Sequence, residues 1–185
     1  MYWLRSSITL SFLVIMNACV PVVDNSVDAG LYEKSLLLVD QGVQLMRLND
    51  LKSAQSSFKV ALELAPIAAA VDGLGCIAFL QGDLDQAESK FLEAYNMDST
   101  YDEALGNLAM VYEAQGKLVE ARKMYTKAIK ANPDNYRFRN NYSIFLAQYG
   151  GTRKHVDDEL RKAGALQEDP IIKQNMKRLG ILTEG

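Results

Sequence analysis

The chain has 185 residues, with 20 Lys and Arg against 23 Asp and Glu. This mildly acidic balance argues against a nucleic-acid-binding protein, which needs a basic surface for phosphates, and no basic cluster reverses it. One histidine, His155, and two cysteines, Cys19 and Cys76, do not form a cluster with the spacing of metal ligands. We therefore expect no metal, no cofactor and no nucleic acid among its partners.

The N-terminus has the pattern of an export signal. An apolar run, Ile8 to Met16, follows a short segment whose only basic residue is Arg5. The run is shorter than the roughly 20 apolar residues that a membrane-spanning helix needs. The signal ends with the tripeptide 16–18, directly before Cys19.

The junction at Cys19 resembles the lipobox of bacterial lipoproteins, in which the cysteine is acylated, for example with palmitate, and becomes the first mature residue. The alternative is a plain secretory signal with an incidental cysteine. The resemblance implies a lipoprotein signal peptide over residues 1–18, a membrane tether over residues 19–30 and a folded domain over residues 31–183.

Three segments of the predicted domain share the pattern Leu-x-x-Ala-x-x-x-aromatic-x-x-Ala: residues 51–66, 84–99 and 118–133. Their first alanines, Ala54, Ala87 and Ala121, are 33 and 34 residues apart. Before each segment lies another helical pattern with a small residue at its centre, and turn signals separate the two at 49–50, 82–83 and 116–117. The central small residues are Gly42, Gly75 and Ala109.

Helix, tight turn, helix and proline at this period resemble the tetratricopeptide repeat (TPR). Residues 136–151 begin a fourth unit, whose second helix reaches Val156, Leu160 and Ala163 only with one extra residue. Pro170 then starts a final helix that would cover the end of the stack. The predicted fold is an all-α TPR solenoid of about four helix-turn-helix repeats plus a C-terminal capping helix.

The sequence offers little that resembles an active site. Gly73 and Gly75 approach a dinucleotide-binding pattern, but they lie inside a repeat helix and do not follow a strand. Cys76 and His155 belong to different repeats, which argues against a nucleophile–base pair. We expect that the protein is not an enzyme.

The surface that faces the hollow of the stack is the predicted protein-binding groove. TPR domains that clamp a terminal carboxylate carry Lys, Arg and Asn there, whereas this chain has Val43, Cys76, Met110 and Ile144 along the centre. These apolar residues favour an apolar partner segment, with Arg47, Asp72, Glu113 and Arg137 as flanking charges. The alternative is that some of these side chains only pack between neighbouring helices. The predicted groove residues are Val39, Val43, Met46, Asp72, Cys76, Phe79, Met110, Glu113, Asn140 and Ile144.

One stretch suggests a cellular role. Residues 131–150 are similar to the Asn-Asn-Tyr-x-x-Phe-Leu stretch of type IV pilus pilotins of the PilF/PilW group, and the overall plan resembles TadD lipoproteins. The resemblance implies an adaptor or assembly factor for a pilus or secretion apparatus, with a secretin or another pilus component as partner. Val20 after the anchor implies the periplasmic face of the outer membrane, because the inner-membrane retention signal of enteric bacteria is Asp there. The alternative is an envelope scaffold that recruits murein hydrolases or outer-membrane assembly factors.

Overall fold

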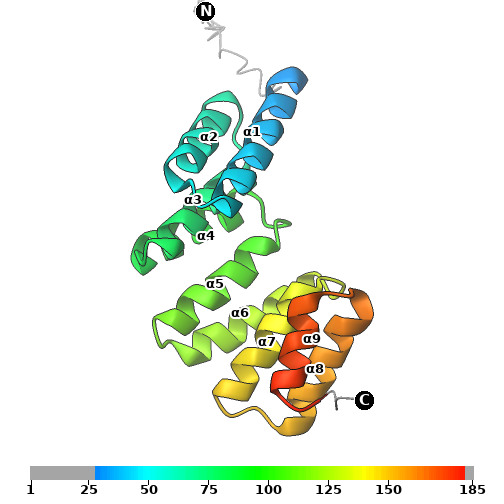
Figure 1. Ribbon diagram of the computed structural model, residues 1–185. Coiled ribbons are helices and arrows are strands. Elements are labelled where there is room, and N and C mark those ends of the chain that lie inside the picture. Colours follow the sequence, from blue (N-terminus) through cyan, green and yellow to red (C-terminus); the bar gives the residue numbers. More distant parts are fainter. Residues whose placement is uncertain (1–27, 182–185) are drawn as a thin grey trace, which may run out of the picture.

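The computed structural model describes residues 28–181, and this range folds into nine α-helices that follow one another in a stack (Figure 1). The predicted all-α solenoid of four helix-turn-helix units and a final helix is confirmed. Its helices are α1 Ala29–Arg47, α2 Leu51–Leu64, α3 Ala68–Leu80, α4 Leu84–Met97, α5 Glu103–Ala114, α6 Leu118–Ala131, α7 Tyr136–Gln148, α8 Arg153–Leu166 and α9 Pro170–Arg178.

The turn inside each unit depends on a residue in the left-handed backbone region. Asn49, Gly82 and Gly116 have φ values of 60°, 82° and 74°, which glycine and asparagine adopt most easily. In the first two units an aspartate follows and caps the second helix: the Asp50 carboxylate accepts a hydrogen bond from the backbone N–H of Ser53, at 3.1 Å. The predicted turns at 49–50, 82–83 and 116–117 are confirmed.

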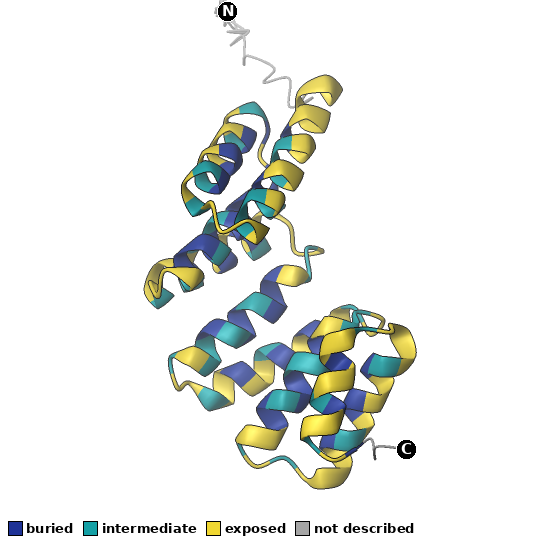
Figure 2. Ribbon diagram, viewed as in Figure 1, coloured by how far each residue is buried: buried dark blue, intermediate teal, exposed yellow. Residues whose placement is uncertain are grey.

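Aromatic side chains of the second helices fill the space between helices. Phe58 of α2 is fully buried between Gly42 of α1 and Gly73 of α3, and a Cβ on Gly42 would lie 2.6 Å from its ring. Because these two glycines have no Cβ, the backbones of α1 and α3 pack directly against the Phe58 ring. Figure 2 shows the buried residues on the sides where helices meet.

The first helices of the units form an inner layer, because α1 contacts α3 and α3 contacts α5. The second helices, α2, α4, α6 and α8, pack outside them. The last helix, α9, packs on α8 and buries Ile172 and Met176 against Leu160 and Ala163, as a cap should. Its neighbour Ile171 is exposed.

The predicted signal peptide, Cys19 and most of the tether lie outside the described residues. The first helix starts at Ala29, two residues before the predicted start of the domain, and the side chain of Asp28 caps it. Within residues 28–181, none of the helices has the length and apolar character needed to cross a bilayer.

Candidate protein-binding groove

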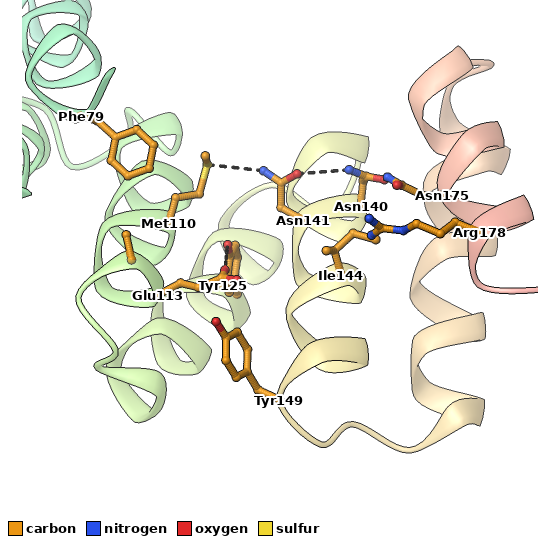
Figure 3. A pocket seen from close by; sticks show the side chains of 11 residues that line it. Phe79, Met110, Glu113, Tyr125, Asn140, Asn141, Ile144, Tyr149, Asn175 and Arg178 are labelled. Atoms are coloured by element: carbon orange, nitrogen blue, oxygen red, sulfur yellow. Dashed lines mark hydrogen bonds between the residues drawn. The ribbon is translucent and has the colours of Figure 1, made fainter. Parts of the chain in front are cut away.

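A cavity of about 570 Å³ opens on the inner layer between α5, α7 and α9 (Figure 3). Its apolar lining includes Phe79, Met110 and Ile144, all half-buried. Polar groups surround this lining, so the cavity offers both apolar contacts and hydrogen bonds. The polar lining residues are Glu113, Tyr125, Asn140, Asn141, Tyr149, Asn175 and Arg178.

Asparagine side chains connect three helices along this cavity. The amide of Asn175 on α9 donates to the Asn140 side chain on α7, at 2.9 Å, and Asn140 donates to Asn141, at 3.1 Å. Asn141 in turn approaches the Met110 sulfur on α5, at 3.6 Å. The row, drawn with dashed lines in Figure 3, fixes the orientation of the amides toward the cavity.

A tyrosine hydroxyl holds the acidic group of the cavity in place. Tyr125 donates to the Glu113 carboxylate, at 2.8 Å. Burial raises the pKa of Tyr125, and the adjacent charge of Glu113 raises it further. The phenol therefore stays protonated and remains a donor at any physiological pH.

A smaller cavity of about 230 Å³ lies next to the first and shares Phe79 and Met110 with it. It adds Met46 of α1, Cys76 of α3 and Asn107 of α5, and its lining is almost entirely apolar. The two cavities together, which we call the concave groove, extend from α1 to α9.

Asp72 lies behind this part of the groove and is 7% exposed. Its carboxylate accepts a hydrogen bond from Asn107, at 2.8 Å, and lies 3.7 Å from the Cys76 thiol. Burial raises the pKa of Asp72 to about 6, although hydrogen bonds from Asn107, Cys76 and Tyr101 oppose the shift. Burial also raises the pKa of the Cys76 thiol, and the nearby charge of Asp72 raises it further. The thiol therefore stays protonated, and this cysteine is a poor nucleophile.

Seven of the ten predicted groove residues line the concave groove. Val39 and Val43 instead pack against the core around Phe58, as the packing alternative expects. Asp72 is too buried to be the exposed flanking charge that the sequence suggested. The seven lining residues are Met46, Cys76, Phe79, Met110, Glu113, Asn140 and Ile144.

Sequence reasoning missed the contribution of the last helix. Asn175 and Arg178 both line the groove, and they lie 34 residues after Asn141 and Ile144. The same spacing relates Ile144 to Met110. Extending the repeat spacing one step further would therefore have identified both residues of α9.

Comparison with known sequences gives the family. Residues 39–104 and residues 78–143 each match a sequence model of the tetratricopeptide repeat, so that matches cover 39–143, more than half of the chain. The chain is a tetratricopeptide-repeat protein. TPR domains are scaffolds that bind segments of other proteins and typically carry no catalytic activity, and this chain is accordingly a protein-interaction module.

Solved TPR structures share the fold at low identity. A thermophilic TPR protein of Thermus thermophilus, TTC0263, superimposes with a TM-score of 0.70 at 21% identity, covering 80% of this chain and 81% of that one. Pseudomonas aeruginosa PilF gives a TM-score of 0.70 at 19% identity, covering 81% and 69%. Both comparisons show the fold alone.

A curated relative is the mouse trafficking protein particle complex subunit 12, which is 29% identical over 107 residues. The match takes in 54% of this TPR chain but only 13% of the mouse protein. The repeats are what the two proteins share.

Proposed function

We propose that the concave groove binds an extended or helical segment of a partner protein. Apolar side chains of the segment would lie against Phe79, Met110 and Ile144, and its backbone would pair with the amides of Asn141 and Asn175. The observation that carries the proposal is this combination of half-buried apolar groups and oriented amides in one open cavity.

The charges of the groove also favour an acidic group of the partner at the α9 end. Arg178 is exposed there, while Glu113 on the α5 side is held by Tyr125. A segment with a carboxylate near Arg178 would gain a charge-assisted hydrogen bond in a partly desolvated site. The expected ligand is therefore an apolar segment with an acidic group at one end.

We further propose that the module works in the bacterial envelope, held at a membrane by a lipid on Cys19, as an adaptor or assembly factor for a pilus or secretion apparatus. The Asn-Asn-Tyr-x-x-Phe-Leu part of the stretch that resembles pilotins lies in α7, and its Asn140, Asn141 and Ile144 all line the groove. The resemblance thus coincides with the surface that would bind the partner.

The groove is tested by placing charges in it. Met110→Glu with Ile144→Glu should retain helicity and melting while partner capture by crosslinking in the native cell is lost, because the partner would have to bury two unpaired carboxylates. Truncation of an anchor residue commonly costs a complex about 2 kcal/mol or more. The matched control, Val60→Glu with Val119→Glu, places the same charges at exposed positions of α2 and α6 and should leave capture unchanged.

A second pair of variants covers the case in which the first one unfolds. Asn175→Ala with Arg178→Ala removes polar groups from a half-buried and an exposed position of α9 and should weaken capture without unfolding the chain. If this double variant is folded and still captures the partner normally, the groove proposal is refuted. Secretin or pilin in the crosslinked product supports the pilus role, whereas a murein hydrolase favours the envelope-scaffold alternative.

The lipid anchor has its own test. Radiolabelled palmitate should label the wild-type protein, and Cys19→Ser should abolish the label while the repeats stay folded. Label that persists in the variant would refute the lipoprotein assignment and leave a plain secretory signal.

A further inference from the structure

Charge is strongly segregated along the stack. Residues 28–116 contain 14 Asp and Glu against 5 Lys and Arg, whereas residues 117–181 contain 7 against 14. The ion pairs Arg139–Glu159 and Arg153–Asp157 form within the basic half and neutralise only a few of its cations. The first half of the molecule is therefore acidic and the second half is basic, with their end helices α1 and α9 at opposite ends of the stack (Figure 1).

The N-terminal end keeps an apolar residue at a position that normally contacts a preceding repeat. In the later units this position holds Ala70, Ala104, Phe138 and Ile172, each buried against the second helix of the unit before it. Its equivalent on α1 is Leu37, which is 71% exposed because the described residues hold no earlier unit. Within residues 28–181, this helix face is therefore uncovered.

The charges and a further leucine around Leu37 define the chemistry of this face. Glu33 and Asp40 lie one helical turn before and after Leu37, and both are exposed. Leu48, at the end of the same helix, is 77% exposed. The open face of α1, which we call the head, is apolar with an acidic border.

The other end presents the opposite charge. Lys173 and Lys177 lie 34 residues after Arg139 and Ser143, so they occupy the equivalent positions of α9. On α7 these positions face α8, the second helix of the same unit, where Arg139 forms an ion pair with Glu159 at 2.7 Å. In the described chain no second helix follows α9, and both lysines are exposed. Ile171, which is 62% exposed, lies on the flank of α9 that faces Tyr136 and Arg137 of α7. The open surface of α9, which we call the tail, is therefore basic along one flank and has an apolar residue on another. Both α1 and the outward side of α9 are largely coloured as exposed in Figure 2.

We propose that a second copy of this chain docks end to end, with the head of one molecule against the tail of another. Leu37 and Leu48 would meet Ile171, and Glu33 and Asp40 would face Lys173 and its neighbours. Because head and tail are different surfaces, the contact is heterologous and can repeat, which produces linear assemblies.

The test is a charge exchange on the full chain, followed by sedimentation velocity at low ionic strength. The head variant is Glu33→Lys with Asp40→Lys, and the tail variant is Lys173→Glu with Gln174→Glu. Wild type should associate increasingly with concentration, and less so near 1 M salt, where the Debye length falls to about 3 Å. Each variant alone should stay monomeric, and an equimolar mixture of the two should associate again, because the exchanged charges are then complementary.

A matched control separates the ends from overall charge. Lys123→Glu with Lys130→Glu reverses two exposed lysines on the outer helix α6 and should associate like wild type. Circular dichroism verifies that every variant is folded. The proposal is overturned if wild type remains monomeric, if the control loses association as the end variants do, or if the mixture fails to recover it.

Discussion

At the scale of single residues, the groove side of the stack contains a carboxylate that costs stability. Asp72 is held by Asn107 of the next unit and has no cation among the groups that shift its pKa. The sequence could not reveal this burial. The equivalent positions in the other units are Val39, Gly106 and Asn140. Two of the partners of Asp72, Asn107 and Tyr101, come from the following repeat.

Asp72→Asn should therefore stabilise the protein near neutral pH. Burial raises the folded-state pKa of Asp72 to about 6, above its ordinary value of 3.8, so folding favours the protonated form. The contribution of Asp72 to the free energy of unfolding is fully present below about pH 4 and is lost as the pH rises through about 6. The gain on substitution should appear over that window and reach about 2–3 kcal/mol above it, since one pKa unit corresponds to 1.36 kcal/mol.

Urea unfolding of wild type and variant across the window measures this gain as a difference. The difference is needed because other carboxylates act in the opposite direction: hydrogen bonds from Ser53 lower the pKa of Asp50. Asp40→Asn, at an exposed position of α1, is the chemical control and should not reproduce the effect. A constant difference between pH 4 and pH 7 would contradict the assigned pKa.

Two glycines in helix interiors should respond in opposite ways to alanine. At Gly73 an added Cβ would collide with the buried Phe58 ring, so Gly73→Ala should destabilise by about 1–3 kcal/mol. At Gly164 the nearest atom to an added Cβ is 3.6 Å away, on Met176, so Gly164→Ala should stabilise by about 0.5–1 kcal/mol through helix propensity. Thermal unfolding of both variants tests this prediction. Equal shifts in Tm would mean that the Phe58 ring does not limit how closely α3 packs against α2.

At the scale of helices, the sequence predicts the repeats well because local signals and packing agree. Each inner turn has its glycine or asparagine, and the second helices of the first three units have their small and aromatic residues in the same places. The fourth unit shows the limit of this reasoning. Its second helix lacks the aromatic residue and is displaced by one position, so the sequence predicts α9 only as a cap, although Asn175 and Arg178 keep the 34-residue spacing and complete the groove.

The capping helix should protect only its neighbours. A chain that ends at Glu168 lacks α9 and exposes Leu160 and Ala163 to solvent. We expect faster hydrogen exchange in α7 and α8, with α1 to α4 unchanged, because repeats in a solenoid contact only adjacent repeats.

A milder variant gives the graded control for this prediction. The carboxylate of Asp169 caps α9 by accepting from the N–H of Ile171, at 2.7 Å, and Asp169→Ala should cost about 1 kcal/mol. Its effect should be smaller and confined to the same helices. Uniformly faster exchange along the whole chain in the truncated protein would show that the stack unfolds as a single unit.

At the scale of the whole molecule, the side-chain bonds between first helices have a mechanical consequence. Asp72–Asn107, Asn141–Met110 and Asn140–Asn175 all join successive units on the inner layer, which is the inside of the bend. Bonds on the inside of a curved rod are stretched when the rod is straightened and relaxed when it bends further. Tension along the stack would therefore stretch these bonds, so the same side chains that shape the groove would add to the resistance of the stack to extension.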